Sequence, residues 1–208
     1  MGLSMNIIDR ADLIGRVRRG DAISLELGCG ARKRNRTAIG IDQLDLPEVD
    51  VVGDVFDVLS LLPQGSVMSI HTYHFLEHVS DLSRIMPELG RVLKPGGELE
   101  VAVPHFANPY YYSDPTHCRP FGLYTFCYLA KSSLFARTVP AYGYQFDFDL
   151  RDVRLHFDSP FISRKIIRRL LLNPFFNLTR WMQEFHEENL CFLFPAYEIC
   201  YKLVRTTQ

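Results

Sequence analysis

The sequence lacks any long hydrophobic run and any recognisable export signal. No stretch of its 208 residues approaches the ~20 apolar residues that a membrane-spanning helix needs. Residues 1–6 do not show the basic and then apolar order of a signal peptide. We therefore expect a cytoplasmic protein.

The sequence also lacks an excess of charge of either sign and a paired-cysteine motif. Its 23 Lys and Arg against 24 Asp and Glu give a formal net charge of −1, which provides no general attraction to nucleic acid or to an anionic membrane. The five cysteines are odd in number and form no C-x-x-C pair, so reduced thiols are expected. We therefore do not expect a nucleic acid to be the substrate.

The most informative feature present is a glycine turn after an apolar segment. Residues 22–27 predict a strand that runs directly into Gly28-Cys29-Gly30, and a second apolar stretch ends at Asp42. Two glycines allow a sharp turn and a close approach to a ligand. A carboxylate at the end of the next parallel strand can accept both hydroxyls of a ribose. Lys33 occupies the position of the third glycine of a dinucleotide fingerprint, so a different nucleoside cofactor is expected.

The pattern E-x-G-x-G followed by an acidic residue resembles motif I of the class I S-adenosylmethionine-dependent methyltransferases. Further segments resemble this family in the right order, and the resemblance covers about residues 20–105. These segments are residues 49–55 with Asp54, the strand predicted at 67–73, the Leu-Glu-His run at 76–78 and Arg-Val-Leu-Lys-Pro-Gly-Gly at 91–97. The resemblance is to the type 11-like methyltransferases and implies S-adenosylmethionine as cofactor, with S-adenosylhomocysteine as product.

The resemblance also implies roles for individual residues. Asp42 would bind the ribose, and Asp54, with Asp57 as the alternative, would contact the adenine amino group. Glu26 would accept from the cofactor's amino group, and the methionine end would lie against Tyr73 and His74. The complete set of expected cofactor-binding residues is Glu26, Gly28, Cys29, Gly30, Asp42, Asp54, Val55, Tyr73 and His74.

Two later segments, residues 103–106 and 112–121, look like a bacterial and archaeal methyltransferase subgroup associated with surface-polysaccharide biosynthesis. This narrower resemblance implies a saccharide or other small-molecule acceptor that is methylated on oxygen. N-methylation of an amino sugar or amine is the alternative within enzymes. A non-catalytic scaffold that binds the cofactor is the alternative outside them.

Strand and helix patterns alternate to about residue 105, which predicts a doubly wound α/β fold. We expect a Rossmann-like, mostly parallel seven-stranded sheet with an antiparallel last strand at 196–205. Helices are predicted at 7–19, 82–93 and 123–134, and an alternating strand at 144–157 is interrupted near Arg151. Residues 160–193 form a helical insertion before the last strand, with Pro174 as a breaker. One domain, 1–208, would combine a cofactor-binding half, 1–105, with an acceptor-side half, 106–208.

The loop after the fifth predicted strand carries the candidate catalytic residues His105, Asp114 and His117. An imidazole titrates near neutral pH and can deprotonate a hydroxyl as it attacks, while a carboxylate orients the ring. The alternative is that 114–117 is a turn in which Asp114 caps the backbone and His117 packs against tyrosine rings.

His74-Phe-Leu-Glu-His78 also matches the H-x-x-E-H motif of zinc peptidases, in which two histidines bind zinc and the glutamate acts as base. No third-ligand helix stands out downstream, although Glu184, Glu187 and Glu188 are candidates. We expect no metal, and a zinc hydrolase is kept as a remote alternative.

Two basic segments suggest partners. Arg32, Lys33, Arg34 and Arg36 could bind an anionic acceptor, or could form a solvated loop. Residues 163–176 predict a basic amphipathic helix. We expect it to cover the site or pack on the sheet, with a membrane surface or a homodimer as the alternatives.

Overall fold

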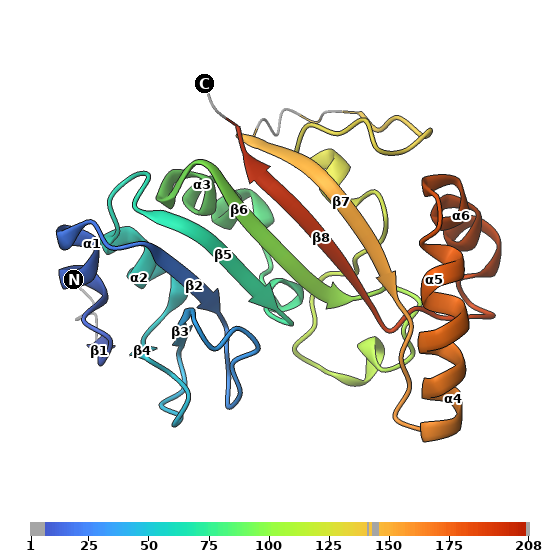
Figure 1. The fold of residues 1–208 in the computed structure, drawn as a ribbon, viewed down its shortest axis with the longest axis horizontal. Helices are drawn as coiled ribbons and strands as arrows, with labels where there is room; N and C mark the ends of the chain where they lie inside the picture. The colour runs from blue at the N-terminus through green and yellow to red at the C-terminus, as the bar shows by residue number, and fades with distance from the viewer. Residues whose placement is uncertain (1–6, 141, 143–145, 207–208) are drawn as a thin grey trace.

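The structure is a computed structural model that describes residues 7–140, 142 and 146–206. Within these residues one sheet has eight strands in the order β1-β4-β3-β2-β5-β6-β8-β7 (Figure 1). The strands are β1 (Ile8–Asp9), β2 (Ile23–Leu27), β3 (Ile39–Asp42), β4 (Val51–Val52), β5 (Val67–Tyr73), β6 (Leu93–Pro104), β7 (Phe148–His156) and β8 (Glu198–Arg205).

The sheet has the predicted doubly wound, Rossmann-like arrangement. Strands β4, β3, β2, β5 and β6 are parallel neighbours. The last strand, β8, runs antiparallel to both β6 and β7, as predicted. The register of β7 shifts between Leu150 and Asp152, which confirms the predicted interruption at Arg151. The eighth strand, β1, was not predicted.

Three helices lead into the parallel strands or connect them, and each buries apolar side chains. These are α1 (Leu13–Arg19), α2 (Val55–Leu61) and α3 (Leu82–Val92). In α3 the side chains at helical spacing, Leu82, Ile85, Met86 and Leu89, are buried against the sheet. Asp81 caps this helix by accepting from the Ser83 N–H at 2.9 Å. The helix predicted at 82–93 is confirmed.

The helix predicted at 7–19 is shorter than expected. Ile8 and Asp9 pair with β4 instead. The Asp9 carboxylate accepts from the N–H groups of Ala11, Leu13 and Ile14, so it satisfies the free donors at the start of α1. The helix therefore begins only at Leu13.

The prediction of a helix at 123–134 is wrong. Only a 3₁₀ turn, Thr125–Tyr128, forms there. Its apolar residues Phe126 and Leu129 are buried, which accounts for the pattern in the sequence. The backbone of Lys131 then pairs with β7, because its N–H donates to Phe148 and its carbonyl accepts from Leu150, both at 2.8 Å. A continued helix would lose this pairing.

The insertion before the last strand is helical, as predicted. It contains α4 (Ile162–Ile167), a wide π turn at Arg168–Leu172, α5 (Asn173–Phe176), α6 (Arg180–Phe185) and a second π turn at His186–Leu190. Pro174 does not break it, because it lies at the start of α5 directly after the wide turn, where its missing N–H is tolerated. The chain leaves the helix at Asn177, and Thr179 caps α6.

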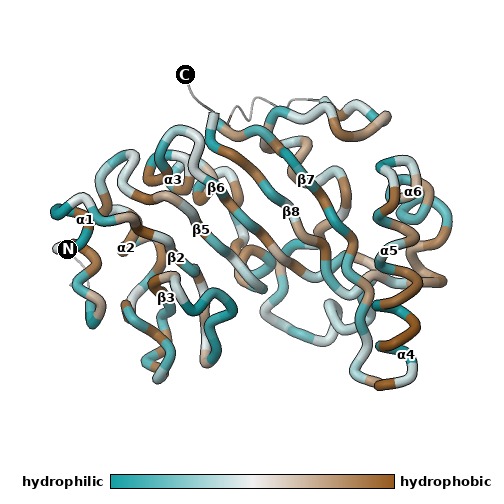
Figure 2. The backbone as a smooth tube through the Cα atoms, viewed as in Figure 1, coloured by the Kyte–Doolittle hydropathy of each residue, from teal (hydrophilic) through white to brown (hydrophobic). Residues whose placement is uncertain are grey.

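The insertion lies along the edge of the sheet beyond β7 (Figure 1). Polar side chains and the buried Phe176 attach it there, so the C-terminal end of 163–176 packs on the core as expected. The apolar side chains of α4 and of the following turn are exposed instead. In Figure 2 much of the α4 tube has the colour of hydrophobic residues. The exposed apolar residues of α4 and of the following turn include Ile162, Ile166, Ile167, Leu170 and Leu171. In the part of the chain that the structure describes, no helix is both long and apolar enough to cross a membrane.

Candidate functional site

The glycine turn at the end of β2 has the tight geometry expected from the sequence. Gly28 and Gly30 have φ angles of 65° and 58°, in the region that favours glycine. A Cβ on Gly28 would lie 2.5 Å from the Phe75 ring, whereas one on Gly30 would meet no atom within 4 Å. A larger side chain at position 28 would therefore clash with Phe75, whereas position 30 favours glycine because of its backbone conformation.

Asp42, at the end of β3, faces this turn. One of its oxygens accepts from the Gly30 N–H at 2.8 Å and the other from the Leu44 N–H at 2.9 Å. The carboxylate is nearly buried. Each oxygen of a carboxylate can accept a further hydrogen bond. The carboxylate is thus held rigidly and can still receive a pair of ligand hydroxyls.

Asp42 lines a cavity of about 590 Å³ at the carboxyl ends of the parallel strands, which is within the usual size of a small-molecule site. The cavity includes four of the predicted cofactor residues besides Asp42, namely Gly28, Asp54, Val55 and His74. The other lining residues are Gln43, Leu44, Phe56, Phe75, His78, Val79, Ser80, Asp81, Arg84 and Thr116. Asp54 also caps α2 through one oxygen, which accepts from the N–H groups of Phe56 and Asp57. Asp57, the alternative to Asp54, is not among the lining residues.

His74 lies in the cavity between two carboxylates. Its Nε2 is 2.9 Å from Glu198 and its Nδ1 is 3.2 Å from Glu77. Burial opposes its protonation, but the hydrogen bonds and charges of Glu198 and Glu77 outweigh burial and raise the pKa of His74 to about 9. An imidazolium is therefore present at neutral pH. The backbone of His74 is left-handed, with φ 57°, which is uncommon for a residue other than glycine.

Glu198 is a site residue that the sequence did not suggest. It lies 124 positions after His74, at the start of β8, and Arg34 is 3.5 Å from the same carboxylate. Burial tends to raise the pKa of Glu198, but His74 and Arg34 hold it below its ordinary value. No motif marks this glutamate, because only the pairing of β8 with β6 brings it to His74.

Four predicted cofactor residues lie outside the lining of this cavity, namely Glu26, Cys29, Gly30 and Tyr73. Glu26 accepts from the N–H groups of Arg34 and Asn35, at 3.0 and 2.7 Å, and so orders the basic loop. The Cys29 side chain packs in a small apolar cluster, and burial, followed by the charge of Asp42, raises its pKa to about 12. The Tyr73 hydroxyl lies 3.3 Å from His71. Their contacts with a cofactor stay predictions.

The basic loop is less available to an anion than its sequence suggested. The Lys33 ammonium lies 2.5 Å from Asp50 and is mostly buried. Arg34 interacts with Glu198 and lies over the Tyr73 ring. Two of the four cations are therefore occupied by groups of the protein itself.

The three predicted catalytic residues have different environments. His105 is fully buried, with Nε2 3.1 Å from Glu187 and Nδ1 accepting from the Ala107 N–H. This geometry does not support His105 as a base. His117 donates from Nδ1 to the Tyr111 carbonyl at 2.8 Å and stacks on the Tyr111 ring.

Asp114 forms the turn that was considered as the alternative. Its Oδ1 accepts from the N–H and hydroxyl of Thr116, at 2.8 and 2.6 Å, and these bonds lower its pKa. Its other oxygen is 3.7 Å from His117 Nε2. The turn and the His117 ring thus form one unit, and the ring centroid of His78 lies 4.8 Å from that of His117.

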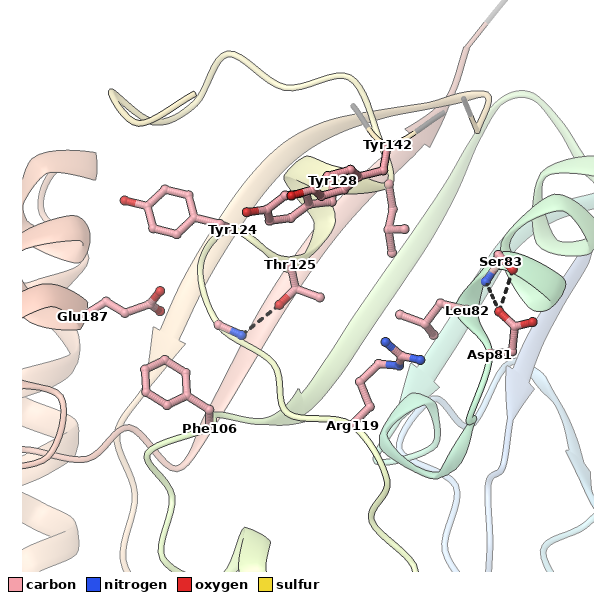
Figure 3. Close-up of a pocket in the computed structure, with 12 residues that line it drawn as sticks. Asp81, Leu82, Ser83, Phe106, Arg119, Tyr124, Thr125, Tyr128, Tyr142 and Glu187 are labelled. Atoms are coloured by element: carbon pink, nitrogen blue, oxygen red, sulfur yellow. Dashed lines mark hydrogen bonds between the residues drawn. The ribbon is translucent and has the colours of Figure 1, made fainter. Parts of the chain in front are cut away.

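A second cavity, of about 480 Å³, adjoins the first, and Asp81 lines both. Figure 3 shows Arg119 and Glu187 on opposite sides of it, with the rings of Tyr128 and Tyr142 close together. These two rings are stacked, with centroids 5.8 Å apart. The lining is completed by Leu82, Ser83, Phe106, Gly122, Tyr124, Thr125 and Leu129. Aromatic faces with a cation and a carboxylate suit a polar ring-shaped ligand.

Comparisons with known proteins agree with this geometry. Residues 17–101 match a family model described as a methyltransferase domain. No curated protein matches the chain in sequence. The solved structure of a SAM-dependent methyltransferase from Archaeoglobus fulgidus is similar in fold, with a TM-score of 0.53, 21% identity and 95% of each chain covered.

Phosphoethanolamine N-methyltransferase 2 of Haemonchus contortus, solved with S-adenosyl-L-methionine, is also similar. Its TM-score is 0.52 at 12% identity, over 90% of this chain and 49% of that chain. At these identities the likenesses establish the fold. The family match covers the glycine turn, Asp42, Asp54 and His74, and it supports a methyltransferase with S-adenosylmethionine as its cofactor.

Proposed function

We propose that the protein transfers a methyl group from S-adenosylmethionine to an oxygen of a saccharide or other small molecule. The observation that supports this most is the rigid Asp42 carboxylate beside the Gly28 turn, in a cavity at the carboxyl ends of parallel strands. The residues fit the cofactor chemically. Asp42 has lone pairs for ribose hydroxyls, Asp54 has them for the adenine amino group, and His74 lines the same cavity. When bound, the cofactor supplies an electrophilic methyl group.

The second cavity is the proposed acceptor site. Stacked tyrosine rings provide apolar faces for a sugar ring, and Arg119 and Glu187 provide polar ends. A surface-polysaccharide precursor stays the favoured acceptor. N-methylation is the second candidate, because one protein of similar fold carries the name of an N-methyltransferase. A non-catalytic scaffold is the third.

Two expected partners stay predictions. The exposed apolar side chains of α4 and the following turn would suit a membrane surface or a second copy of the chain. Asp158 pairs with Arg169 and lies 4.0 Å from Lys165, so part of the positive charge there is already neutralised.

Calorimetric titration with S-adenosylmethionine and S-adenosylhomocysteine tests the cofactor. We expect the wild type to bind both, and Asp42→Asn to bind at least about tenfold more weakly, because a neutral amide accepts less well from two hydroxyls. The control is Asp45→Asn, an exposed neighbour whose carboxylate pairs with Arg10. Wild-type protein that binds neither compound would refute the proposal.

Transfer of labelled methyl groups to a panel of sugars and amines then distinguishes the three candidates. Label in an ether linkage supports O-methylation, and label on an amine supports the second candidate. Cofactor binding with no transfer to any member of the panel favours the scaffold.

A further inference from the structure

Three side chains to which the proposed function assigns no contact with the cofactor or the acceptor meet beside the cofactor cavity. Glu77 and His78 lie in a 3₁₀ turn, Leu76–His78, directly after β5, and His117 comes from the loop after β6. Each offers one ligand atom, and these atoms all lie within 4.8 Å of one another. This is the only such group of three among the described residues.

Hydrogen bonds orient both histidines for coordination. The Thr116 hydroxyl donates to Asp114 at 2.6 Å, so its oxygen accepts from His78 Nδ1 at 2.9 Å. His117 Nδ1 donates to the Tyr111 carbonyl. In a neutral ring this arrangement leaves the lone pair on Nε2, and the Nε2 of His117 also lies 3.7 Å from Asp114. A second bond of this kind on the other ring nitrogen is typical of metal-binding histidines.

Glu77 supplies the observation that points to a ligand. Its side chain is fully buried, and its Oε1 is held by His74 at 3.2 Å. Its Oε2 is buried without a hydrogen-bond partner among the described residues. A buried, unpartnered carboxylate oxygen is costly, and a cation beside it would remove that cost.

We propose that Glu77, His78 and His117 bind one divalent transition-metal ion. Two imidazoles and one carboxylate form a ligand set typical of zinc and of non-haem iron, and such sets leave positions open for water or substrate. The sequence led us to expect no metal, because no third-ligand helix stands out downstream of His74-Phe-Leu-Glu-His78. The set differs from the H-x-x-E-H reading, since both nitrogens of His74 are engaged by carboxylates.

His78 and Thr116 line the cofactor cavity, so the open positions lie near the reacting groups. There the ion would bind the acceptor oxygen and lower the pKa of its hydroxyl. The hydroxyl proton would pass to water, and the oxygen would take the methyl group as the bond from that group to the cofactor sulfur breaks. This role rests on the proposed function, whereas metal binding itself does not.

Metal binding can be measured directly. Protein stripped with a chelator is titrated with Co²⁺ alone, followed by visible absorption, and the bound Co²⁺ is then displaced with Zn²⁺. We expect one equivalent per chain in the wild type. His117→Ala and His78→Ala should each weaken binding by about a hundredfold or more, and Thr116→Val by about tenfold, the lower end for a supporting group. His156→Gln, on β7, is the matched control and should bind like the wild type.

Titration of the same proteins with S-adenosylhomocysteine separates the two proposals. His117 does not line the cofactor cavity, so His117→Ala should keep its affinity for this compound, which also shows that it is folded. Wild-type protein that takes up no Co²⁺, or a His117→Ala protein with unchanged Co²⁺ affinity, would overturn the metal site. Metal uptake without binding of S-adenosylhomocysteine would instead refute the proposed function.

Discussion

At the scale of single residues, the environment decides what each histidine does. His74 is charged at neutral pH because two carboxylates bind it. His186 is fully buried among Phe157, Phe176 and Phe194, and burial lowers its pKa. Its Nε2 donates to the Phe194 carbonyl at 2.9 Å. The two side chains are chemically identical, so their opposite charge states arise from their neighbours.

His186 predicts a loss of stability in acid. Above the ordinary value of 6.5 the ring is neutral in both the folded and unfolded states, so it adds no pH dependence. Below 6.5 the unfolded chain binds the proton more readily, so the free energy of unfolding falls as pH falls. His186→Phe keeps an aromatic ring and removes the ionisable group that causes this pH dependence. We expect the melting temperature of the variant to decline less than that of the wild type between about pH 7 and pH 5.

Thermal unfolding followed by circular dichroism at several pH values measures this difference. The variant is expected to be less stable at pH 7, because the Phe194 carbonyl loses its donor. Parallel curves for the two proteins would contradict the argument.

At the scale of secondary structure, the free edge of β7 is closed by side chains rather than by another strand. The Asn177 amide accepts from the Leu155 N–H at 2.9 Å and donates to its carbonyl at 2.7 Å. Asn173 makes the same pair of bonds with Phe157. The helical insertion thus protects an edge that could otherwise pair with another chain.

Asn177→Ala should therefore destabilise the protein. The substitution leaves the N–H and carbonyl of the buried Leu155 without partners, at a cost of about 2–4 kcal/mol. For a chain of this size that corresponds to a melting temperature lower by about 5–15 °C. Asn189→Ala is the control, because Asn189 donates only to an exposed carbonyl on its own helix. Equal melting temperatures for the two variants would show that the edge contact is not stabilising.

At the scale of the whole molecule, acidic and basic residues almost cancel, with a formal net charge of −1. The basic clusters that the sequence suggested are partly neutralised within the fold. Lys33 pairs with Asp50, Arg34 with Glu198 and Arg169 with Asp158. Phosphate-backbone binding needs several free cations on one surface, and such binding weakens steeply with salt.

We accordingly expect weak binding to RNA. Fluorescence anisotropy with a labelled single-stranded RNA should show no saturation at micromolar protein in about 50 mM salt. Saturable binding that falls sharply between about 50 and 200 mM salt would contradict this expectation and make a nucleic-acid acceptor the leading candidate.

The sequence by itself determined several strands and helices of the parallel part of the sheet. The strand before Gly28, the strand ending at Asp42 and the helix at 82–92 could be predicted, because each depends on a pattern within a few neighbouring residues. The predicted residues Gly28, Asp42, Asp54, Val55 and His74 meet in one cavity because the carboxyl ends of parallel strands share an edge.

Tertiary structure alone decided what depends on distant pairing. The contact between His74 and Glu198 exists because β8 returns beside β6, and His117 reaches His78 because the loop after β6 folds back. The backbone of Lys131 pairs with β7, which is also a long-range contact, and this pairing is incompatible with the helix predicted at 123–134. Side-chain periodicity shows which face of a segment is apolar. Only the packing of the whole chain decides which segment covers that face, or whether it stays exposed as along α4.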